Sequence, residues 1–223
     1  MIPAVVIAAG LGTRLRPLTE HYAKPVLPID GRPVLSQLLR ELASAACPRV
    51  TVVSGHLGEQ LRQLVGDGSG FDLEVTWARQ EAPNGSLDAA LAARETPPYL
   101  VVGADVLFAP GDLARFSEAH AASGAAGALA VRPQPGSVEI RDGLVERVVG
   151  EGGLAAAPLW AIGPALQPYV AARPGAAPYE LATAFQHAID AGERVVGVEI
   201  GATRDLTTPL DLLEQNFAYL SSL

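Results

Sequence analysis

The sequence contains little cysteine, little lysine and few aromatic residues, and these shortages exclude several classes of protein. The single cysteine, Cys47, excludes an internal disulfide and any metal site built from several cysteines. It lies among apolar residues, and we expect it to be a small buried side chain in a reducing cytoplasm. No apolar run reaches the roughly 18 residues of a membrane span, and the residues after Met1 are typical of a buried strand rather than a signal peptide. We therefore predict a cytoplasmic protein without a membrane partner.

The scarcity of lysine is the most specific of these shortages. Lys24 is the single lysine beside 15 arginines, and the two residue types are not interchangeable where a compact ammonium must meet a phosphate. The net charge of −8 disfavours general binding to nucleic acid. Residues 1–32 nevertheless carry +2, so the remaining residues carry −10. A cationic segment in an acidic protein indicates a small anionic ligand held locally, which makes Lys24 a candidate for chemistry.

The spacing of apolar residues predicts one α/β domain over 1–223. Apolar residues make up 49% of the chain, enough for a substantial core. In the first half, strand-like runs alternate with helix-like segments, which is typical of a parallel, doubly wound sheet with helices on both faces. We predict strands over 4–8, 49–53, 73–78 and 99–103, and helices over 33–46, 57–65 and 86–94. Ser86 is the expected cap of the last of these helices.

The second half of the sequence has a less regular pattern. We predict strands over 125–131, 137–141, 144–149, 159–162 and 194–200, and helices over 178–191 and 208–220. Asp142 and Gly143 supply a hairpin turn. Pro209 suits the first turn of the closing helix, with Thr208 as its cap.

The connection over residues 10–31 has little helical periodicity, and connections of that length are usually functional or disordered. Its three prolines and its apolar residues make disorder improbable. Gly10 and Gly12 let backbone N–H groups approach an anion. Thr13 offers a hydroxyl, and Arg14 offers a planar fork for phosphate oxygens. Since ligands of open α/β sheets bind beyond the carboxyl ends of the strands, we expect this loop to hold phosphate groups.

Two common phosphate-binding loops do not fit the segment. Leu15 stands where a dinucleotide fingerprint needs its third glycine, and no Gly-Lys-Ser/Thr closes a P-loop. The segment instead closely resembles the signature of the sugar-phosphate nucleotidyltransferases. The resemblance lies in the pattern Gly10-x-Gly12-Thr13-Arg14-Leu15-x-Pro17-Leu18-Thr19, followed by Lys24-Pro25-Val26-Leu27-Pro28-Ile29.

That resemblance implies a Rossmann-like, mixed and mostly parallel sheet with a small β-rich acceptor-binding lobe. Residues 1–110 would bind a nucleotide, and residues 111–223 would bind the acceptor and close the site. The implied reaction is Mg²⁺-dependent transfer of a nucleotidyl group from a nucleoside triphosphate to a sugar 1-phosphate, with release of pyrophosphate. Arg14 and Lys24 would be the catalytic cations. The triphosphate would lie on Ala8, Ala9, Gly10, Gly12 and Thr13.

Two more segments resemble the family. Gln80, Gly85 and Ser86 have the spacing of its base-reading element, and a glutamine amide donates and accepts together, which suits a pyrimidine edge. Asp105 follows a buried strand, and Asp205 begins a segment similar to the family's Asp-x-Gly-Thr-Pro. By this resemblance the two aspartates would hold Mg²⁺, which favours one or two carboxylates plus phosphate oxygens.

The acceptor side departs from the family pattern. Ala104 intervenes where the family usually has Gly-Asp, and Thr207 replaces a usual glycine. Many members carry a mid-chain Glu-Lys-Pro whose lysine binds the sugar phosphate, and this chain has no second lysine. Arg147 could substitute for it. Glu180 would either contact the sugar or cap a helix, because a carboxylate suits a helix's first turn.

These departures keep other functions open. One alternative is a cytidylyltransferase, or another nucleotidyltransferase, for a non-sugar or cyclitol phosphate. A choline acceptor would need an aromatic cage, for which Trp77 and Trp160 are the candidates. An alternative of another class is a non-catalytic relative that binds nucleotide and regulates a partner. The nucleobase, the acceptor and the oligomeric state are left open.

Overall fold

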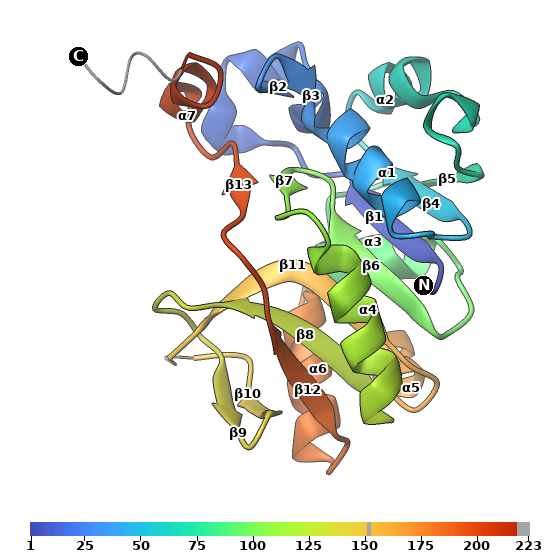
Figure 1. Cartoon of the computed structure of the whole chain (residues 1–223), viewed down its shortest axis with the longest axis vertical. Helices are drawn as coiled ribbons and strands as arrows, with labels where there is room; N and C mark the ends of the chain where they lie inside the picture. Colours follow the sequence, from blue (N-terminus) through green and yellow to red (C-terminus); the bar gives the residue numbers. More distant parts are fainter. Residues whose placement is uncertain (151–152, 218–223) are drawn as a thin grey trace.

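The computed structural model describes residues 1–150 and 153–217, which fold around a nine-stranded sheet (Figure 1). The strand order is β5-β4-β1-β6-β11-β8-β12-β10-β9. Four parallel neighbours come from the first half: β1 (Ala4–Ala8), β4 (Val50–Ser54), β5 (Val75–Arg79) and β6 (Tyr99–Gly103). β1, β4 and β6 are almost wholly buried, as parallel strands covered on both faces should be. The predicted fold class and the first-half strands are confirmed.

The second half joins the same sheet through an antiparallel strand. β11 (Ala155–Ile162) lies between β6 and β8 (Gly127–Arg132) and runs antiparallel to both. β12 (Val195–Glu199) runs parallel to β8. The predicted hairpin of β9 (Glu139–Arg141) and β10 (Leu144–Arg147) forms the far edge. The β-rich part expected from the sequence is therefore an extension of the common sheet.

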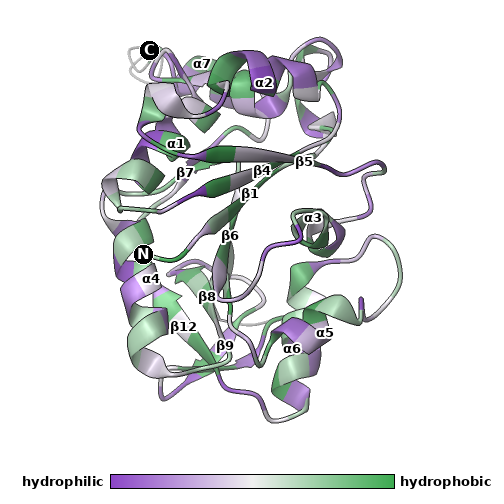
Figure 2. Ribbon diagram, turned by 90° about the vertical axis from the view of Figure 1, so that its right-hand side faces the viewer, coloured by the Kyte–Doolittle hydropathy of each residue, from purple (hydrophilic) through white to green (hydrophobic). Residues whose placement is uncertain are grey.

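Helices cover both faces of this sheet. The core on one face is shared by α1 (Val34–Ser44), α2 (Gly58–Val65) and α4 (Asp112–Ser123). The core on the other face is shared by α3 (Ser86–Ala92), α5 (Gln167–Ala171) and α6 (Leu181–Asp190). Figure 2 shows α4 on one side of the strands and α3, α5 and α6 on the other. The structure is thus doubly wound, as predicted.

Two of these helices, α4 and α5, are not predicted from the sequence, and each has a physical reason. α4 buries Asp112, Ser117 and His120 beside Leu113 and Phe116, so its inner face has too few apolar residues to show a clear helical period. α5 has only five residues, which is too short for any period to appear.

The closing helix begins as predicted but ends earlier. α7 (Pro209–Glu214) starts with Pro209 behind Thr208, whose hydroxyl accepts from the Asp211 N–H. The Asp211 carboxylate in return accepts from the N–H groups of Thr207 and Thr208, and these bonds hold its pKa below the ordinary value. The predicted continuation over residues 218–220 lies outside the described residues.

The long loop after β1 is built from short turns. Single 3-10 turns cover Thr13–Leu15, Leu18–Glu20 and Lys24–Val26, and a small hairpin of β2 (Pro28–Ile29) and β3 (Arg32–Pro33) follows. This segment has a small core of its own, made by Leu15, Leu27, Ile29, Val34 and Leu206. The loop is therefore ordered by apolar contacts, as its composition indicated.

Two expectations from composition can be compared with the structure. Cys47 is buried, and burial raises the pKa of its thiol to about 11, so it is the unreactive small side chain that we expected. Within the part of the chain that the structure describes, no helix combines the length and the apolar character needed to cross a bilayer.

Candidate active site

A cavity of about 310 Å³ opens at the carboxyl ends of β1 and β6. This is the edge at which open α/β sheets bind ligands. Its walls come from the loop after β1, the start of α3, β6, β11, the start of α6 and the segment after β13 (Arg204–Asp205). They are formed by Ile7, Ala8, Gly10, Gly12, Thr13, Arg14, Leu15, Lys24, Pro25, Ser86, Val101, Gly103, Asp105, Pro158, Trp160, Leu181 and Thr207.

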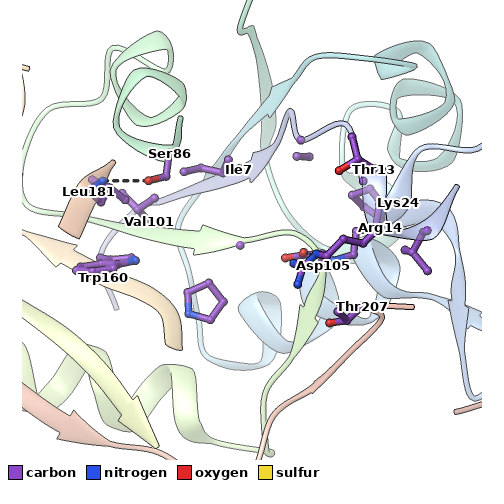
Figure 3. Close-up of a pocket in the computed structure, with 17 residues that line it drawn as sticks. Ile7, Thr13, Arg14, Lys24, Ser86, Val101, Asp105, Trp160, Leu181 and Thr207 are labelled. Atoms are coloured by element: carbon purple, nitrogen blue, oxygen red, sulfur yellow. Dashed lines mark hydrogen bonds and ion pairs between the residues drawn. The ribbon is translucent and has the colours of Figure 1, made fainter. Parts of the chain in front are cut away.

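The cavity has two chemically different ends (Figure 3). Thr13, Arg14, Lys24, Asp105 and Thr207 gather at one end, which we call the charged end. The other end, which we call the apolar end, is formed by Ile7, Val101, Trp160 and Leu181, together with Ser86. Pro158 also lines the cavity and lies against Gly103 of β6. An anionic group would be held at the charged end, and an apolar or flat group would pack at the other.

The glycine loop at the charged end has a fixed backbone. Gly12 has a φ of +63°, and a Cβ placed there would lie 2.8 Å from the Thr19 Cγ2 and 3.3 Å from the Lys24 Cβ. The buried Thr19 hydroxyl donates to the Gly12 carbonyl at 2.8 Å. Only glycine fits both this conformation and this space. The predicted phosphate loop is thus held open toward the cavity by a contact within the loop itself.

Lys24 lies between this loop and the end of β6. Its Nζ donates to the Asp105 Oδ2 at 2.5 Å, and its side chain is only 12% exposed. Gln60 of α2 fixes the preceding residues, because its amide accepts from the Ala23 N–H at 2.8 Å and donates to the His21 carbonyl at 2.7 Å. An ammonium has three donors, so Lys24 can keep Asp105 and still bind a phosphate oxygen.

Asp205 is brought to the same end by a two-stranded ribbon. β13 pairs antiparallel with β7 (Val106–Leu107), and Asp205 lies opposite Val106, the neighbour of Asp105. The Asp205 Oδ2 accepts from the Thr207 hydroxyl at 3.0 Å, and Thr207 lines the cavity. Two aspartates 100 residues apart in sequence thus lie on neighbouring segments of the chain, and that they hold a metal together stays a prediction.

The donor set of this end suits a hard cation shared with a ligand. Among residues 1–150 and 153–217, no group of three or more histidine, cysteine or acidic side chains is arranged to hold a metal ion. Asp105 and Asp205 provide carboxylate oxygens, and Mg²⁺ characteristically adds phosphate oxygens and water to one or two carboxylates. The two aspartates therefore fit a Mg²⁺ whose remaining ligands are water molecules or the oxygens of a phosphorylated ligand.

The predicted base-reading segment has a different arrangement from the one expected. Gln80 is 7% exposed, and its Nε2 donates to the Gly85 carbonyl at 3.0 Å. Neither Gln80 nor Gly85 belongs to the cavity wall, whereas Ser86 does. Gly85 has a φ of +99°, and a Cβ there would lie 2.2 Å from the Tyr179 carbonyl oxygen. Gln80 thus braces a tight turn against the second half of the chain.

Ser86 and Glu180 bind each other rather than standing apart as nucleotide and acceptor ligands. The Glu180 carboxylate accepts from the Ser86 N–H at 3.2 Å and from its hydroxyl at 2.5 Å. The Ser86 hydroxyl accepts from the Leu181 N–H at 3.0 Å. Ser86 is the first residue of α3 and not its predicted cap, because Gly85 holds that position. Glu180 caps α3 from another segment, a variant of the capping alternative.

Of the three remaining candidates for the acceptor side, Trp160 lies at the cavity, whereas Arg147 and Trp77 lie elsewhere. Arg147 lies on the β9–β10 hairpin, pairs with Glu139 and is not part of the cavity wall. Trp77, on β5, donates to the Gly66 carbonyl and stacks with Arg62 of α2. Trp160 lines the cavity and packs edge-on against Phe185 at 4.7 Å. Only one of the two candidate rings is thus available there, too few for an aromatic cage.

Most of the apolar end and Pro158 were missed by sequence reasoning. Pro158 and Trp160 come from β11, which enters the sheet beside β6 although some 50 residues separate them in sequence. Leu181 begins α6, and Ile7 and Val101 are strand residues of the cavity floor. No local motif marks them, because the antiparallel insertion of β11 alone puts Pro158 next to Gly103.

A glycine loop, a largely buried lysine and two aspartates lie at the carboxyl edge of a doubly wound α/β sheet, an arrangement that suits phosphate groups. The family model described as nucleotidyl transferase matches residues 3–153, which is more than half of the chain. The chain belongs to the nucleotidyl transferase family.

Curated relatives support the family without settling the substrate. A CMP-5'-(3-aminopropyl)phosphonate synthase of Streptomyces rubellomurinus is 36% identical over 141 residues, 61% of this chain and 22% of that protein. An N-acetylmuramate alpha-1-phosphate uridylyltransferase of Neisseria meningitidis is 33% identical over 108 residues, 47% of each chain. The chain thus matches about half or less of the length of these relatives.

Solved structures support the fold. A UDP-glucose pyrophosphorylase complexed with UDP-glucose superposes with a TM-score of 0.83 over 100% of both chains at 18% identity. The UDP-glucose pyrophosphorylase from Acinetobacter baumannii superposes with a TM-score of 0.79, over 98% of this chain and 93% of that one, at 20% identity. At these identities the likeness concerns the fold alone.

Proposed function

We propose that the protein is a nucleotidyltransferase that moves a nucleotidyl group from a nucleoside triphosphate to a sugar 1-phosphate and releases pyrophosphate. The observation that carries this proposal is the contact of Lys24 with Asp105 at 2.5 Å beside the Gly12–Arg14 backbone. It joins a phosphate-binding cation and a metal-binding carboxylate at one end of a cavity. Family membership supports the same reaction.

The reaction is an in-line displacement at the α-phosphorus. An oxygen of the acceptor phosphate forms a new bond to that phosphorus, while the bond to the oxygen bridging to the β-phosphorus breaks and its electron pair leaves with pyrophosphate. Such chemistry needs positioning and charge neutralisation more than proton transfer. Lys24 holds phosphate oxygens in line, and Arg14 stabilises the charge that develops on the pyrophosphate.

Mg²⁺ is the metal we propose for this reaction. When bound, it supplies Lewis-acid stabilisation of the phosphate oxygens. Asp105, just before β7, and Asp205 on the paired β13 would hold it, and Thr207 orients Asp205 through the bond from its hydroxyl.

The choice of substrates is proposed from weaker support. A pyrimidine nucleotide is favoured by the spacing of Gln80 and Gly85, although the Gln80 amide is engaged within the protein. The acceptor must do without a second lysine, so Arg14 and Lys24 are the cations of the cavity wall among the described residues. A phosphonate or cyclitol phosphate is a second candidate, because a relative that is 36% identical over 61% of this chain is named for a phosphonate. A cytoplasmic location remains a prediction.

Pyrophosphate release measured over a grid of substrates tests the proposal. The grid combines ATP, GTP, CTP, UTP and dTTP with glucose 1-phosphate, N-acetylglucosamine 1-phosphate, N-acetylmuramate 1-phosphate, an inositol phosphate and 3-aminopropylphosphonate, each with and without Mg²⁺. We expect turnover for a pyrimidine nucleotide with one sugar 1-phosphate, and only with Mg²⁺. Turnover confined to the phosphonate would select the second candidate. Nucleotide binding without any turnover would favour the regulatory alternative.

A further inference from the structure

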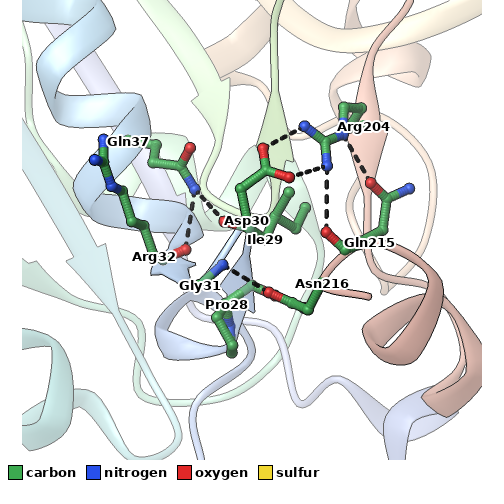
Figure 4. Close-up of polar contacts among 9 residues, drawn as sticks. All are labelled: Pro28, Ile29, Asp30, Gly31, Arg32, Gln37, Arg204, Gln215 and Asn216. Atoms are coloured by element: carbon green, nitrogen blue, oxygen red, sulfur yellow. Dashed lines mark hydrogen bonds and ion pairs between the residues drawn. The ribbon is translucent and has the colours of Figure 1, made fainter. Parts of the chain in front are cut away.

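Arg204 is the neighbour of Asp205 on β13, and all three nitrogens of its guanidinium donate hydrogen bonds (Figure 4). Nη1 and Nη2 bind the two oxygens of Asp30 at 2.6 and 2.9 Å. Nε donates to the Gln215 Oε1 at 2.7 Å, and Nη2 also reaches the Gln215 carbonyl at 3.4 Å. We call these contacts of Arg204 with Asp30 and Gln215 the Arg204 clamp. A planar guanidinium held at all three nitrogens fixes its own backbone closely.

The partner of this clamp is the turn that follows the Lys24 segment. Asp30 stands at the tip of the β2–β3 hairpin, which begins at Pro28, and its N–H donates to the Gln215 carbonyl at 3.2 Å. Asn216 accepts from the Gly31 N–H at 2.8 Å and donates to the Pro28 carbonyl at 2.7 Å. The turn is thus bound directly to the end of α7.

The same turn is also braced from α1. The Gln37 amide donates to the carbonyls of Ile29 and Arg32, both at 2.9 Å. The hairpin is therefore a firm support, held on one side by α1 and on the other by the end of α7. A residue clamped to it is fixed relative to the loop that carries Lys24.

The geometry of a strand connects this clamp to the candidate metal site. Successive side chains of a strand point to opposite sides, so a clamp that draws Arg204 toward the hairpin turns Asp205 the other way. β13 is only two residues long, so its pairing with β7 adds few backbone bonds to the contacts of the clamp, the burial of Leu206 and the Thr207 bond to Asp205. Asp205 lies opposite Val106, the residue that follows Asp105. Asp205 has to stay at this place in the ribbon if the two carboxylates are to bind one cation.

We propose that Arg204 is a positioning residue, whose clamp on Asp30 holds Asp205 beside Asp105 so that both can share a divalent cation. The proposal rests on the proposed function. It assigns no contact with substrate to Arg204. Breaking the clamp should therefore lower the affinity for the cation more than it lowers the stability of the fold. The Arg204 and Asp30 side chains are 42% and 58% exposed, and exposed ion pairs add little stability.

The test is a titration of the full chain with Mn²⁺ in the absence of nucleotide. The electron paramagnetic resonance signal of free Mn²⁺ measures how much of the metal is bound. We expect Arg204→Gln to raise the dissociation constant of Mn²⁺ at least fivefold and Asp30→Asn to raise it to a similar extent. The double variant should add no more than twofold, because the two residues act as one unit. Asp30→Glu, which keeps a carboxylate, should restore most of the affinity.

A matched control separates this effect from the loss of any ion pair. Arg49 pairs with Glu95 at 2.5 Å far along the sheet from the cavity, and its side chain is exposed to a similar degree. Arg49→Gln should leave Mn²⁺ binding unchanged. In turnover assays, Arg204→Gln should raise the Mg²⁺ concentration for half-maximal rate at least fivefold while the KM for the nucleotide stays within twofold.

The possible failures are distinguishable. If the wild-type chain turns over in a metal-dependent way but Arg204→Gln and Asp30→Asn bind Mn²⁺ as the wild type does, the role of Arg204 is overturned and the proposed function stands. Equal losses in Arg49→Gln would also overturn it. If the wild-type chain binds no Mn²⁺ and releases no pyrophosphate, both proposals fall.

Discussion

The two halves of the chain contribute opposite chemistry to one cavity. Among the described residues, the charged side chains of the cavity wall are Arg14, Lys24 and Asp105, and all three come from residues 1–110. The second half contributes Pro158, Trp160, Leu181 and Thr207, none of them charged. It also places Asp205 beside the charged end. The first half thus provides the charged groups that suit phosphates, and the second half shapes the apolar end of the cavity.

This difference indicates how substrates would divide between the halves. Charge neutralisation at the phosphates should govern turnover, whereas packing at the apolar end should govern which acceptor binds. Changes at the charged end should therefore lower kcat, and changes at the apolar end should raise the KM of the acceptor. The following predictions test that division, in order of decreasing effect.

Lys24→Ala should have the largest effect. Removal of one preorganised charge in such a site typically costs about 10²–10³ in turnover, and we expect at least that loss with the fold intact. Lys24→Arg should recover little, because a guanidinium does not replace an ammonium at this short contact with Asp105. Steady-state pyrophosphate release and circular dichroism measure the two properties. A rate within tenfold of the wild type would contradict the assignment of Lys24.

Asp105→Asn should come next, with a loss of about 10² in kcat, because it removes a carboxylate oxygen from the candidate metal site and the partner of Lys24. The half-saturating concentration of Mg²⁺ should rise at the same time. A titration of the rate with Mg²⁺ measures both. An unchanged metal requirement in this variant would place the metal elsewhere.

Trp160→Phe should have a moderate effect confined to the acceptor. The smaller ring keeps an aromatic partner for Phe185 but leaves part of the apolar end unfilled. We expect the KM of the acceptor to rise roughly tenfold, equivalent to about 1.4 kcal/mol of binding, with kcat within threefold. Trp77→Phe is the matched control, because Trp77 stacks with Arg62 outside the cavity. Equal effects of the two substitutions would contradict a role for Trp160 in acceptor binding.

The smallest effect concerns the stability of the second half. Burial lowers the pKa of His120, and its Nε2 has no hydrogen-bond partner among the described residues. The unfolded chain therefore takes up a proton more readily than the folded protein, so stability is full above the ordinary pKa of about 6.5 and falls as the pH drops below it. Urea unfolding at pH 7.5 and 5.5 should show a smaller decrease for His120→Gln than for the wild type. Parallel decreases would mean that His120 does not contribute.

The sequence and the structure agree best where a pattern depends on neighbours in the chain. The stripe Leu35, Leu38, Leu39 and Leu42 specified α1, and all four are buried. Gly10, Gly12 and Arg14 specified a phosphate loop, and they line the cavity. Thr208 and Pro209 specified the start of α7. Each of these depends on backbone conformation and apolar periodicity within a few residues, which a single sequence shows directly.

Agreement was poorer where a side chain has a choice of distant partners. Gln80 was assigned to a nucleobase, and the structure shows that its Nε2 donates to the Gly85 carbonyl within the protein. Arg147 was considered for the acceptor and pairs with Glu139 on a hairpin. Glu180 caps α3 through Ser86, 94 residues away in the chain. Nothing in the local sequence distinguishes these partners, because they are selected by strand order and packing.

The sequence by itself determined the family, the doubly wound fold and the charged end of the cavity, because glycines, prolines and a lone lysine act through local geometry and charge. The tertiary structure alone decided the apolar end and the support of Asp205. The antiparallel insertion of β11 brought Trp160 beside Val101, and the clamp of Arg204 on Asp30 joined residues 174 positions apart. Such contacts arise only when the whole sheet has formed, since no short segment contains both partners.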